Sequence, residues 1–479
     1  MLKSISKYKY QILLWLSIVF FIIIFSYLSI RRYRTLNSYY YDLGIMNQVV
    51  YNTSQGRFLE MTNQELIKNT SRLAIHFDPI MALFAPFYKI YQGPEVLLIG
   101  QAIILGLGAL AVFLISKKIL NQDLISLIFS LLYLLYFPIQ RVSLFDFHAV
   151  TLSTTFFLFA LYFNLVNKNN FYFLFIFLAL LTKENIGLVV IFLGLYLTFV
   201  KKQKRLGVVT SLTGLIFFVS TVYFIIPYFR GTEHFATKYF FDIKSRLNTI
   251  FVDGFSYVKI LILPNFYSLF SPLTLLMSLP EWAINILSSN NNMRSIFFHY
   301  NSVIVAFIFY SLILGYKNFL NIVKNKKLRI IFFAIFIFLN LRSVYKYNPV
   351  PYFVSDPIFY KEIDAIKTNS IKIWKNNLKD ENIKVSTTPK LAPFFTNRKY
   401  YYNFLYDSAF NEMGLTEKDI LKKEMNKYVL ADYVIINKSE IGDVNTETLP
   451  VKFYQKLRND HDFKIIFSDS QDIEVYKKI

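Results

Sequence analysis

The stretch QILLWLSIVFFIIIFSYLSI, residues 11–30, decides the fold. A run of about 20 apolar residues is what a helix needs to cross the hydrocarbon core of a membrane. A cleaved signal peptide would have a shorter apolar core and a small-residue cleavage site. Here Arg31, Arg32 and Arg34 follow instead. We therefore expect an uncleaved first membrane span.

The composition of the whole chain extends this reading. Of its 479 residues, 54% are apolar and 19% aromatic, whereas only 17% are charged. A soluble globular chain carries roughly 25% charged residues. The chain has no cysteine, which excludes disulfides, thiolate metal sites and a cysteine nucleophile. The composition therefore indicates an integral membrane protein.

Ten further apolar runs follow the first and give about eleven predicted spans. They lie at 95–116, 123–138, 149–166, 171–182, 186–200, 206–227, 257–271, 272–288, 300–316 and 330–344. Several runs are shorter than about 17 residues, so a re-entrant pair over 257–288 is an alternative to two crossings. We expect residues 1–344 to form a mainly α-helical, multi-pass bundle.

The positive charge indicates how this bundle is oriented. Residues 1–344 hold 31 Lys and Arg against 12 Asp and Glu, while residues 345–479 hold 21 against 19. If every run crosses, 15 basic residues of the short loops and the N-terminus fall on one side, with Asp123 as its only acid. Positive loops stay in the cytoplasm. We therefore place residues 31–94 and the tail outside the plasma membrane, and we expect membrane lipids, not nucleic acid, as partners.

The tail, residues 345–479, predicts a small extracytoplasmic α/β domain. Residues 358–369 have a helical pattern. Short β-rich runs follow at 383–387, 432–437, 463–468 and 472–477. The tail shows neither a nucleotide-binding loop nor the spacing of metal ligands.

Two motifs that could carry chemistry lie in the predicted outer loop, 31–94. YYYDLGIMNQVVYNTSQGRF, residues 39–58, predicts a short amphipathic helix on the membrane surface. Asp42 at its start is either a helix cap or a carboxylate held beside the mouth of the bundle. His76 and Asp78, two residues apart, could bind a metal, receive a proton or orient a substrate; an Asp-Pro turn also explains Asp78.

Three further motifs place ionisable groups beside or inside apolar runs. Arg141 shares a short outer loop with Phe145-Asp146-Phe147-His148, and Thr182-Lys183-Glu184-Asn185 forms a tight turn between two short spans. Glu281 falls inside the run 272–288, and the loop after it is closed by Arg294, His299 and Tyr300. Ionisable groups at membrane depth are costly and mark functional sites by default. Interfacial anchoring and solvated loop charge are the structural alternatives.

Together these residues predict one outward-facing cavity. The cations Arg141, Lys183 and Arg294 would bind the phosphate of a lipid-linked sugar. A carboxylate would take the proton of an acceptor hydroxyl as it attacks the anomeric carbon. The carboxylates expected in the cavity are Asp42, Asp78, Asp146, Glu184 and Glu281.

Several motifs in order resemble an uncharacterised prokaryotic multi-pass membrane family, domain of unknown function two thousand and seventy-nine. They are YDLGIMNQVVYNTSQGRF, HFDPIMALFAPFY, LFDFH, LLTKENIGL, LPEWAINILSSNNNMRSIFFHY and, in the tail, ADYVIIN. The resemblance covers roughly residues 30–345 and the tail. That family in turn is similar to the GT-C glycosyltransferases, membrane enzymes that use polyprenyl-phosphate-linked sugars.

The GT-C resemblance implies roles for particular residues. Asp42 matches the acidic residue of the first outer loop, and His76 to Pro79 loosely matches a His-Pro element, although Leu43 stands where GT-C loops often have a second acid. The resemblance implies Asp42 as general base, with Asp78 or Glu184 as alternatives. It leaves a divalent metal open, held by Asp42, His76 and Asp78 if present. The expected substrate-binding residues are His76, Arg141, Asp146, His148, Lys183, Glu281, Arg294, His299 and Tyr300.

The leading hypothesis is a transferase that moves a sugar from a polyprenyl-phosphate donor to an envelope glycan, lipid or protein. A transporter or flippase for an envelope lipid is the first alternative, because Glu184 and Glu281 lie in or near the bilayer. A non-catalytic membrane scaffold whose tail binds a partner is the second.

Overall fold

Two compact units make up the protein. The computed structural model describes residues 2–65, 67–232, 247–349, 362–404 and 427–479, with Lys418 and Lys422 besides. Unit 1 is Met1–Ser29, Leu73–Ile80 and Leu98–Pro357. Unit 2 is Ile30–Arg72, Met81–Leu97 and Ile358–Ile479. The first loop and the C-terminal tail therefore share one compact unit.

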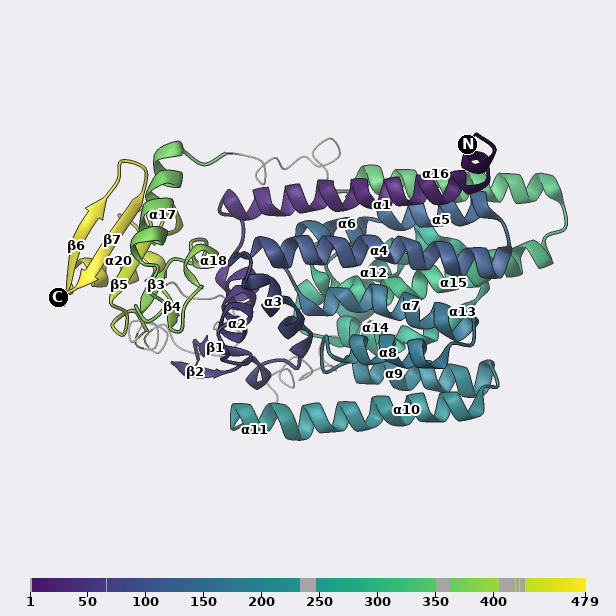
Figure 1. The fold of residues 1–479 in the computed structure, drawn as a ribbon, viewed down its shortest axis with the longest axis horizontal. Helices are drawn as coiled ribbons and strands as arrows, with labels where there is room; N and C mark the ends of the chain where they lie inside the picture. Colours follow the sequence, from purple (N-terminus) through teal and green to yellow (C-terminus); the bar gives the residue numbers. More distant parts are fainter. Residues whose placement is uncertain are drawn as a thin grey trace. The chain divides into compact units, whose positions relative to one another are not determined.

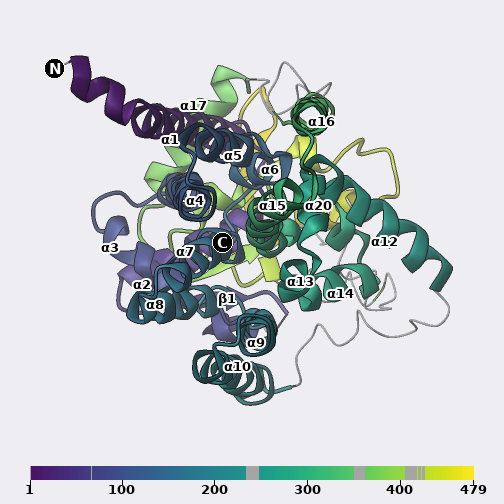
Figure 2. The ribbon, with the colours of Figure 1, turned by 90° about the vertical axis from the view of Figure 1, so that its right-hand side faces the viewer.

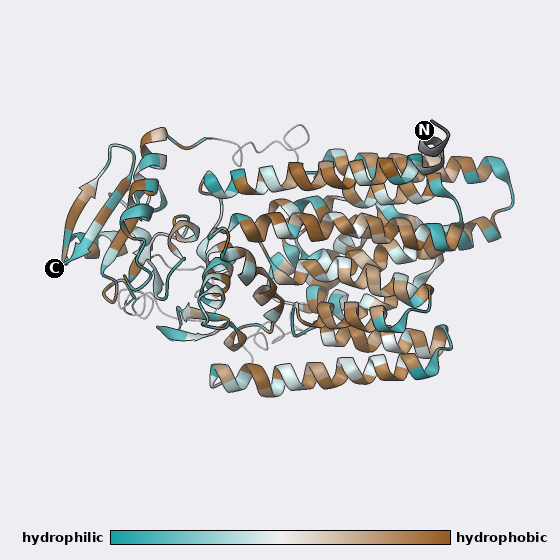
Figure 3. Cartoon of the chain, viewed as in Figure 1, coloured by the Kyte–Doolittle hydropathy of each residue, from teal (hydrophilic) through white to brown (hydrophobic). Residues whose placement is uncertain are grey.

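Long apolar helices dominate unit 1 (Figure 1), and hydrophobic residues cover most of their length (Figure 3). Within the described residues, six helices are long and apolar enough to cross a membrane. They are α1 (Leu2–Arg34), α4 (Glu95–Leu120), α10 (Lys204–Val219) with η6 (Ser220–Ile225) and α11 (Ile226–Arg230), α12 (Leu247–Ile262) with η9 (Leu263–Phe270), α15 (Ser302–Ile322) and α16 (Lys326–Tyr347).

The remaining predicted runs are helical but shorter or broken. A pair bent by 45° would make a seventh span, α5 (Asp123–Leu135) with α6 (Phe137–Leu144). Shorter helices are α7 (Ser153–Leu165) after η4 (Ala149–Leu152), α8 (Asn169–Leu180), and α9 (Ile186–Leu195) with η5 (Tyr196–Val200). The run 272–288 breaks into α13 (Pro272–Leu275), η10 (Leu276–Ser278) and α14 (Leu279–Leu287). All eleven predicted runs are thus helical, and six or seven have the length of a full crossing.

Glycines let α9 and α10 approach closely, and these helices lie side by side in Figures 1 and 2. A Cβ atom on Gly187 would lie 2.8 Å from the carbonyl oxygen of Gly214. One on Gly194 would lie 2.5 Å from the carbonyl oxygen of Gly207. Small residues at such an interface allow backbone-to-backbone packing where lipid offers no hydrophobic drive. This packing fixes the start of α9, and with it the turn 182–185.

The tail forms a five-stranded mixed sheet with the strand order β4-β3-β5-β7-β6. Its strands are β3 (Val385–Thr387), β4 (Tyr401–Asn403), β5 (Tyr433–Asn437), β6 (Phe463–Ser468) and β7 (Ile473–Lys478). β3 runs parallel to β4 and β5, with Val385 opposite Tyr433, whereas β7 runs antiparallel to β5 and β6. Strands were predicted at β3, β5, β6 and β7, and three-residue β4 was missed.

Helices cover both faces of this sheet. α20 (Leu449–Arg458) packs with Val434 and Ile436 of β5 in one apolar core. α17 (Ala365–Asn377) places Trp374 against Tyr433 and Phe467. Because successive strand residues point to opposite faces, the two helices lie on opposite sides. The helix predicted at 358–369 begins later, since the Asp364 side chain caps it by accepting the Ile366 N–H at 2.7 Å; residues 358–361 lie outside the described residues.

The first loop adds a π-helical turn, η1 (Tyr40–Gly44), the helix α2 (Ile45–Ser54), a hairpin of β1 (Glu60–Asn63) and β2 (Lys68–Ser71), and α3 (Ala85–Tyr88). A helix therefore occupies the stretch predicted to be amphipathic. Its polar side chains Asn47, Gln48 and Asn52 are buried, however, and do not face the surroundings. The Gln48 amide donates to Thr62 Oγ1 at 3.1 Å and to the Arg398 carbonyl at 3.3 Å. The polar side of α2 thus faces the hairpin and the tail.

A bidentate ion pair ties the end of α2 to the tail. The Arg57 guanidinium donates to Glu381 at 3.0 Å and 2.7 Å, and the Tyr51 hydroxyl donates to the same carboxylate at 2.9 Å. The hydrogen bond from Arg57 holds the pKa of Glu381 below its ordinary value. Bidentate charged bonds of this kind are stronger than neutral ones.

Arg57→Ala is expected to weaken unit 2 by roughly 1–3 kcal/mol, because it leaves a half-buried carboxylate without its charged donor. The stabilisation from Glu381 is present above its unfolded pKa of about 4.3 and is lost as the pH falls through the lower folded-state pKa. The protection factors of the amides over residues 45–57, which are corrected for the pH dependence of intrinsic exchange, should therefore fall on acidification more in wild type than in Glu381→Gln.

Glu362→Gln is the matched control, because Glu362 pairs with Arg31 at 3.3 Å but its side chain is 82% exposed. An exposed pair contributes little. Equal exchange in Arg57→Ala and Glu362→Gln would contradict the assignment of Arg57–Glu381 as a main tie of unit 2.

Candidate functional site

The turn 182–185 between α8 and α9 holds the first part of a polar network in unit 1. Glu184 at this turn is buried, and one carboxylate oxygen lies 2.9 Å from His76 Nδ1. The other oxygen accepts the backbone N–H of Phe77 at 3.0 Å. The Ile80 N–H also donates to the Leu181 carbonyl, at 3.1 Å. The segment 73–80 is therefore bound to the turn through both oxygens of one carboxylate.

A second carboxylate extends this network into the helices. The Asn185 amide donates to Glu281 Oε2 at 2.7 Å. Glu281 and Asn285 are one helical turn apart on α14, and both are buried. The Asn285 amide donates to the Tyr257 hydroxyl and to the Tyr300 carbonyl, each at 3.0 Å. Tyr257 in turn donates to Asn301 Oδ1 at 2.6 Å. Direct hydrogen bonds between protein groups therefore hold the carboxylate and the amides.

Two histidines join the network through ring contacts. The rings of His148 and His299 stack with centroids 3.7 Å apart, and the His299 ring lies 4.2 Å from that of Tyr300. The Lys183 ammonium lies 5.9 Å from the centre of the Tyr300 ring. Residues predicted from four separate motifs thus meet in unit 1: His76, His148, Lys183, Glu184, Glu281, His299 and Tyr300.

The two predicted arginines have defined partners. Arg141 lies in α6 and not in a loop, as the sequence had suggested, since the helix continues to Leu144. Its Nε donates to the Tyr347 carbonyl at 2.7 Å, and its guanidinium lies 4.1 Å from the Phe297 ring. Arg294 donates to the carbonyls of Ile286 and Ser288 at 3.2 and 2.6 Å. Arg294 therefore caps the C-terminus of α14, which a cation there stabilises.

Several buried polar atoms of the network have no hydrogen-bond partner among the described residues. They are Asn185 Oδ1, Asn285 Oδ1 and His299 Nδ1. Lys183 is half-buried, and within the same residues its ammonium forms neither a hydrogen bond nor an ion pair. Buried polar groups are nearly always bonded, so an unbonded atom is a position at which a water or a ligand group can bind. The network can thus accept further hydrogen-bonding groups, and it offers a cation for an anion.

The remaining predicted carboxylates are placed as follows. Asp78 directly precedes η3 (Pro79–Phe84), and both it and Asp146 are buried in unit 1. Asp42 belongs to unit 2 and lies inside the π-helical turn, whose N-cap is Tyr39. Asp42 is therefore not the helix cap that was one reading of the sequence. Where the chain is described, no three His, Asp or Glu side chains gather as a metal site would require.

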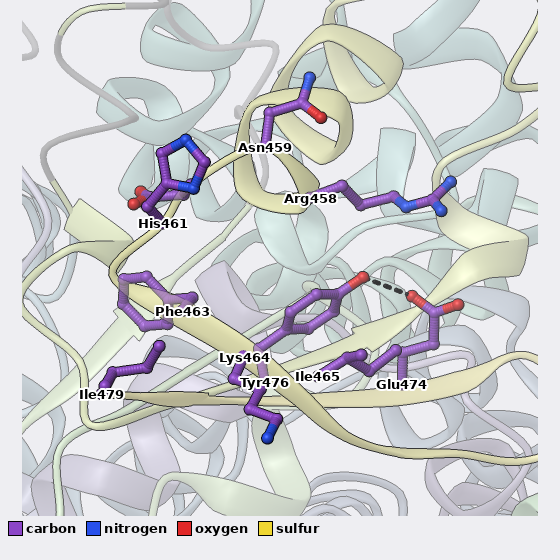
Figure 4. A pocket seen from close by; sticks show the side chains of 10 residues that line it. Arg458, Asn459, His461, Phe463, Lys464, Ile465, Glu474, Tyr476 and Ile479 are labelled. Carbon is purple, nitrogen blue, oxygen red and sulfur yellow. Dashed lines mark hydrogen bonds between the residues drawn. The ribbon is translucent and has the colours of Figure 1, made fainter.

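A cavity of about 710 Å³ lies in unit 2, beside the edge strand β6 (Figure 4). Arg458, His461 and Lys464 line it together with the rings of Phe463 and Tyr476. The Tyr476 hydroxyl donates to the carboxylate of Glu474 at 2.8 Å, and Tyr454 donates to the same oxygen. The predicted site residues do not line this cavity, and its Glu474 carboxylate is already bonded.

Sequence reasoning missed two contributors to the unit 1 network, Gln101 and Tyr257. The Gln101 side-chain NH2 donates to the Val142 carbonyl at 2.8 Å, and its side-chain oxygen accepts the backbone N–H of His148 at 3.0 Å. A lone glutamine inside the apolar run 95–116 was the available signal. Nothing comparable distinguished Tyr257, because this chain has 35 tyrosines.

A family model described as predicted membrane protein (DUF2079) matches residues 32–471. The chain belongs to this family. The resemblance inferred from the motifs is thereby confirmed.

The fold is similar to that of ArnT from Cupriavidus metallidurans, a GT-C glycosyltransferase whose crystal structure was determined bound to undecaprenyl phosphate. The TM-score is 0.53 at 9% sequence identity, and the match covers 96% of this chain and 98% of ArnT. The likeness therefore extends over both units and concerns the fold. No curated protein matches the sequence.

Glu184→Ala is expected to loosen the segment 73–80, because both carboxylate oxygens that bind His76 and the Phe77 N–H are lost together, while the Ile80–Leu181 backbone bond remains. Glu184→Gln keeps one oxygen for the Phe77 N–H and should have a smaller effect. At roughly 1–3 kcal/mol for the lost bonds, amide exchange in residues 73–80 should accelerate about tenfold or more in the alanine variant. Asp123→Asn, which breaks the peripheral pair of Asp123 with Lys117 at 2.7 Å, is the control. Identical exchange in both Glu184 variants would contradict the bidentate role.

Proposed function

We propose that this protein is a GT-C-type glycosyltransferase that moves a sugar from a polyprenyl-phosphate donor to an acceptor of the cell envelope. The observation that carries the proposal is the likeness to ArnT over 96% of the chain, since that enzyme's structure holds undecaprenyl phosphate. The buried acid, imidazole and amide groups of unit 1 support it, because a purely structural bundle would leave such groups out of its core.

The proposed reaction is a single displacement at the anomeric carbon. An acceptor hydroxyl oxygen forms the new glycosidic bond as the bond between that carbon and the phosphate oxygen breaks. The polyprenyl phosphate leaves with the electron pair, and the hydroxyl proton passes to a carboxylate or imidazole acting as general base. The configuration at the anomeric carbon is inverted.

Lys183 is proposed to bind the donor phosphate. Its ammonium is half-buried, has no ion pair within the described residues and sits over the Tyr300 ring. A phosphate oxygen would be the partner of the Lys183 ammonium. The side-chain oxygens of Asn185 and Asn285 would accept hydrogen bonds from sugar hydroxyls. Arg141, whose Nε donates to the Tyr347 carbonyl, is proposed to bind the same phosphate.

Asp42 is proposed as the general base, by its match to the GT-C pattern. Its place in a π-helical turn supports this choice, because such turns occur frequently at functional sites. Asp78 and Glu184 remain the alternative bases. Glu184 is bonded to His76, an arrangement in which a carboxylate orients an imidazole and makes it a better proton acceptor.

The chain is proposed to lie in the plasma membrane with its N-terminus in the cytoplasm. The strong bias of Lys and Arg toward one set of short loops supports this orientation. Unit 2 would then face the outside, where no ATP is available. A sugar already activated on a lipid phosphate is the donor chemistry suited to that side.

Asp42→Asn is expected to lower sugar release by about 10²–10⁴-fold, the usual contribution of a general base. The measurement uses purified protein in nanodiscs with a panel of radiolabelled polyprenyl-phosphate sugars, and it follows release of sugar from the lipid. Glu362→Gln, an exposed carboxylate elsewhere in unit 2, is the control and should keep full activity. Full activity of Asp42→Asn would move the base to Asp78 or Glu184. Saturable lipid binding without release from any donor would favour the lipid transporter.

Lys183→Met is expected to weaken donor binding roughly 10- to 100-fold, the value of a charge-assisted bond. Lys183→Arg keeps the charge and should retain part of the affinity. Equilibrium binding of a fluorescent short-chain polyprenyl phosphate provides the readout, with Lys168→Met, a surface lysine between α7 and α8, as the control. Unchanged affinity in Lys183→Met would remove Lys183 from the phosphate site.

A further inference from the structure

The turn that carries Asp42 has an uncommon backbone. Tyr40–Gly44 forms a π-helix, and the Gly44 N–H donates to the Tyr39 carbonyl five residues back, at 3.0 Å. The extra residue in such a turn changes the direction in which its side chains project, relative to a continuous α-helix starting at Tyr40. π-helical turns are rare because their geometry is less favourable. Something outside the turn must therefore hold it.

The tail contacts the turn on the N-terminal side of Asp42. The rings of Tyr40 and Tyr401 stack with centroids 5.0 Å apart and planes 25° from parallel, and both side chains are fully buried. The Lys390 ammonium lies 5.7 Å from the centre of the Tyr39 ring. Stacked aromatic pairs contribute about 0.5–1.5 kcal/mol beyond the area that they bury.

The hairpin of the first loop locks the two tyrosines together. The Gln64 amide donates to the Tyr40 hydroxyl at 2.9 Å and to the Tyr401 carbonyl at 3.0 Å. The Tyr401 N–H donates to Thr62 Oγ1 at 3.1 Å, and the Tyr40 hydroxyl donates to the Thr62 carbonyl at 3.2 Å. The ring stack is thus fixed through its polar atoms as well as its faces.

The tail also contacts the chain on the C-terminal side of Asp42. A Cβ atom on Gly44 would lie 3.4 Å from the Ala392 Cβ and 3.2 Å from the Tyr40 ring, so the glycine permits close approach. One turn later, the buried Asn47 amide donates to Thr396 Oγ1 at 2.9 Å and to Asn397 Oδ1 at 2.7 Å. Asp42 is therefore flanked on both sides by residues that the tail holds.

We infer that residues 390–403 of the C-terminal domain position Asp42, with Tyr401 as the main positioning residue. The inference rests on the proposed function for the role of Asp42, but not for the geometry of the turn. It makes the C-terminal domain a part of the catalytic apparatus, in contrast to a separate module that only recruits an acceptor. Truncation or displacement of this domain would then remove activity by releasing a carboxylate some 360 residues away in sequence.

The geometric part is tested by thiol labelling, because the chain has no cysteine. Asp42→Cys introduces a single thiol at the turn, and its reaction rate with a water-soluble maleimide reports how the turn is held. Adding Tyr401→Ala should raise this rate at least about threefold through local opening, while Tyr401→Phe should leave it unchanged. Tyr428→Ala is the matched control, since Tyr428 is an equally buried ring that packs within the tail against Phe404 and Phe463.

The catalytic part is tested on the chain with Asp42 intact, by sugar release in nanodiscs. Tyr401→Ala should lower kcat at least tenfold with little change in KM, and Tyr401→Phe should restore it. If Tyr401→Ala does not fold, Asn47→Ala, which breaks the contact on the other side, replaces it in both assays.

The outcomes separate the inference from the proposed function. A wild-type protein that releases no sugar from any donor would refute the proposed function, while the labelling rates still decide whether the tail holds the turn. Active Tyr401→Ala with unchanged labelling would overturn the inference and leave the proposed function standing. Equal acceleration in Tyr428→Ala would also overturn it, because general loosening of the sheet would then explain the effect.

Discussion

Buried polar side chains need hydrogen-bond partners, and in unit 2 this requirement joins the two ends of the chain. Helix α2 carries Asn47, Gln48 and Asn52 among its buried residues, and leaving such groups unbonded would cost about 1–3 kcal/mol each. The hairpin β1–β2 and the tail segment around Arg398 supply most of the partners. The π-helical turn, the tyrosine stack and the Arg57–Glu381 pair all depend on this docking. The unit is consequently specified by hydrogen bonds as much as by apolar area.

In unit 1 the groups that need partners are carboxylates, which lie buried among apolar helices. Glu184 is bonded to the His76 ring and to the Phe77 backbone N–H, and Glu281 is bonded to the Asn185 amide. The close approach of α9 and α10 at their glycines holds the turn from which two of these groups project. Asn185 Oδ1, Asn285 Oδ1 and His299 Nδ1 of this network are among the buried polar atoms without a hydrogen-bond partner in the described residues, and others lie elsewhere, as in η9.

Local signals in the sequence predicted the fold well, and long-range contacts could not be predicted. Continuous apolar runs marked the helices of the bundle except α6 and the first half of α12, and β-rich runs marked β3, β5, β6 and β7, whereas β4 was missed. The sequence also drew attention to Lys183, Glu184 and Glu281, because charge inside apolar surroundings is a local anomaly. The pairing of His76 with Glu184 spans 108 residues and that of Tyr40 with Tyr401 spans some 360. A single sequence contains no signal for either pairing, nor for a π-helical turn.

The discontinuous make-up of unit 2 has a consequence for biosynthesis. The first loop leaves the ribosome before all of Leu98–Pro357, and its partner, the tail, follows only afterwards. At about 5–20 residues per second, the delay is on the order of 10–50 s. During this time α2 lacks its partners in the tail, Thr396, Asn397 and the Arg398 carbonyl, so unit 2 is completed last, after the helices of the bundle have been made. A chain that stops before the tail therefore contains the helices of unit 1 but leaves the polar side of α2 without its tail partners, so unit 2 stays incomplete.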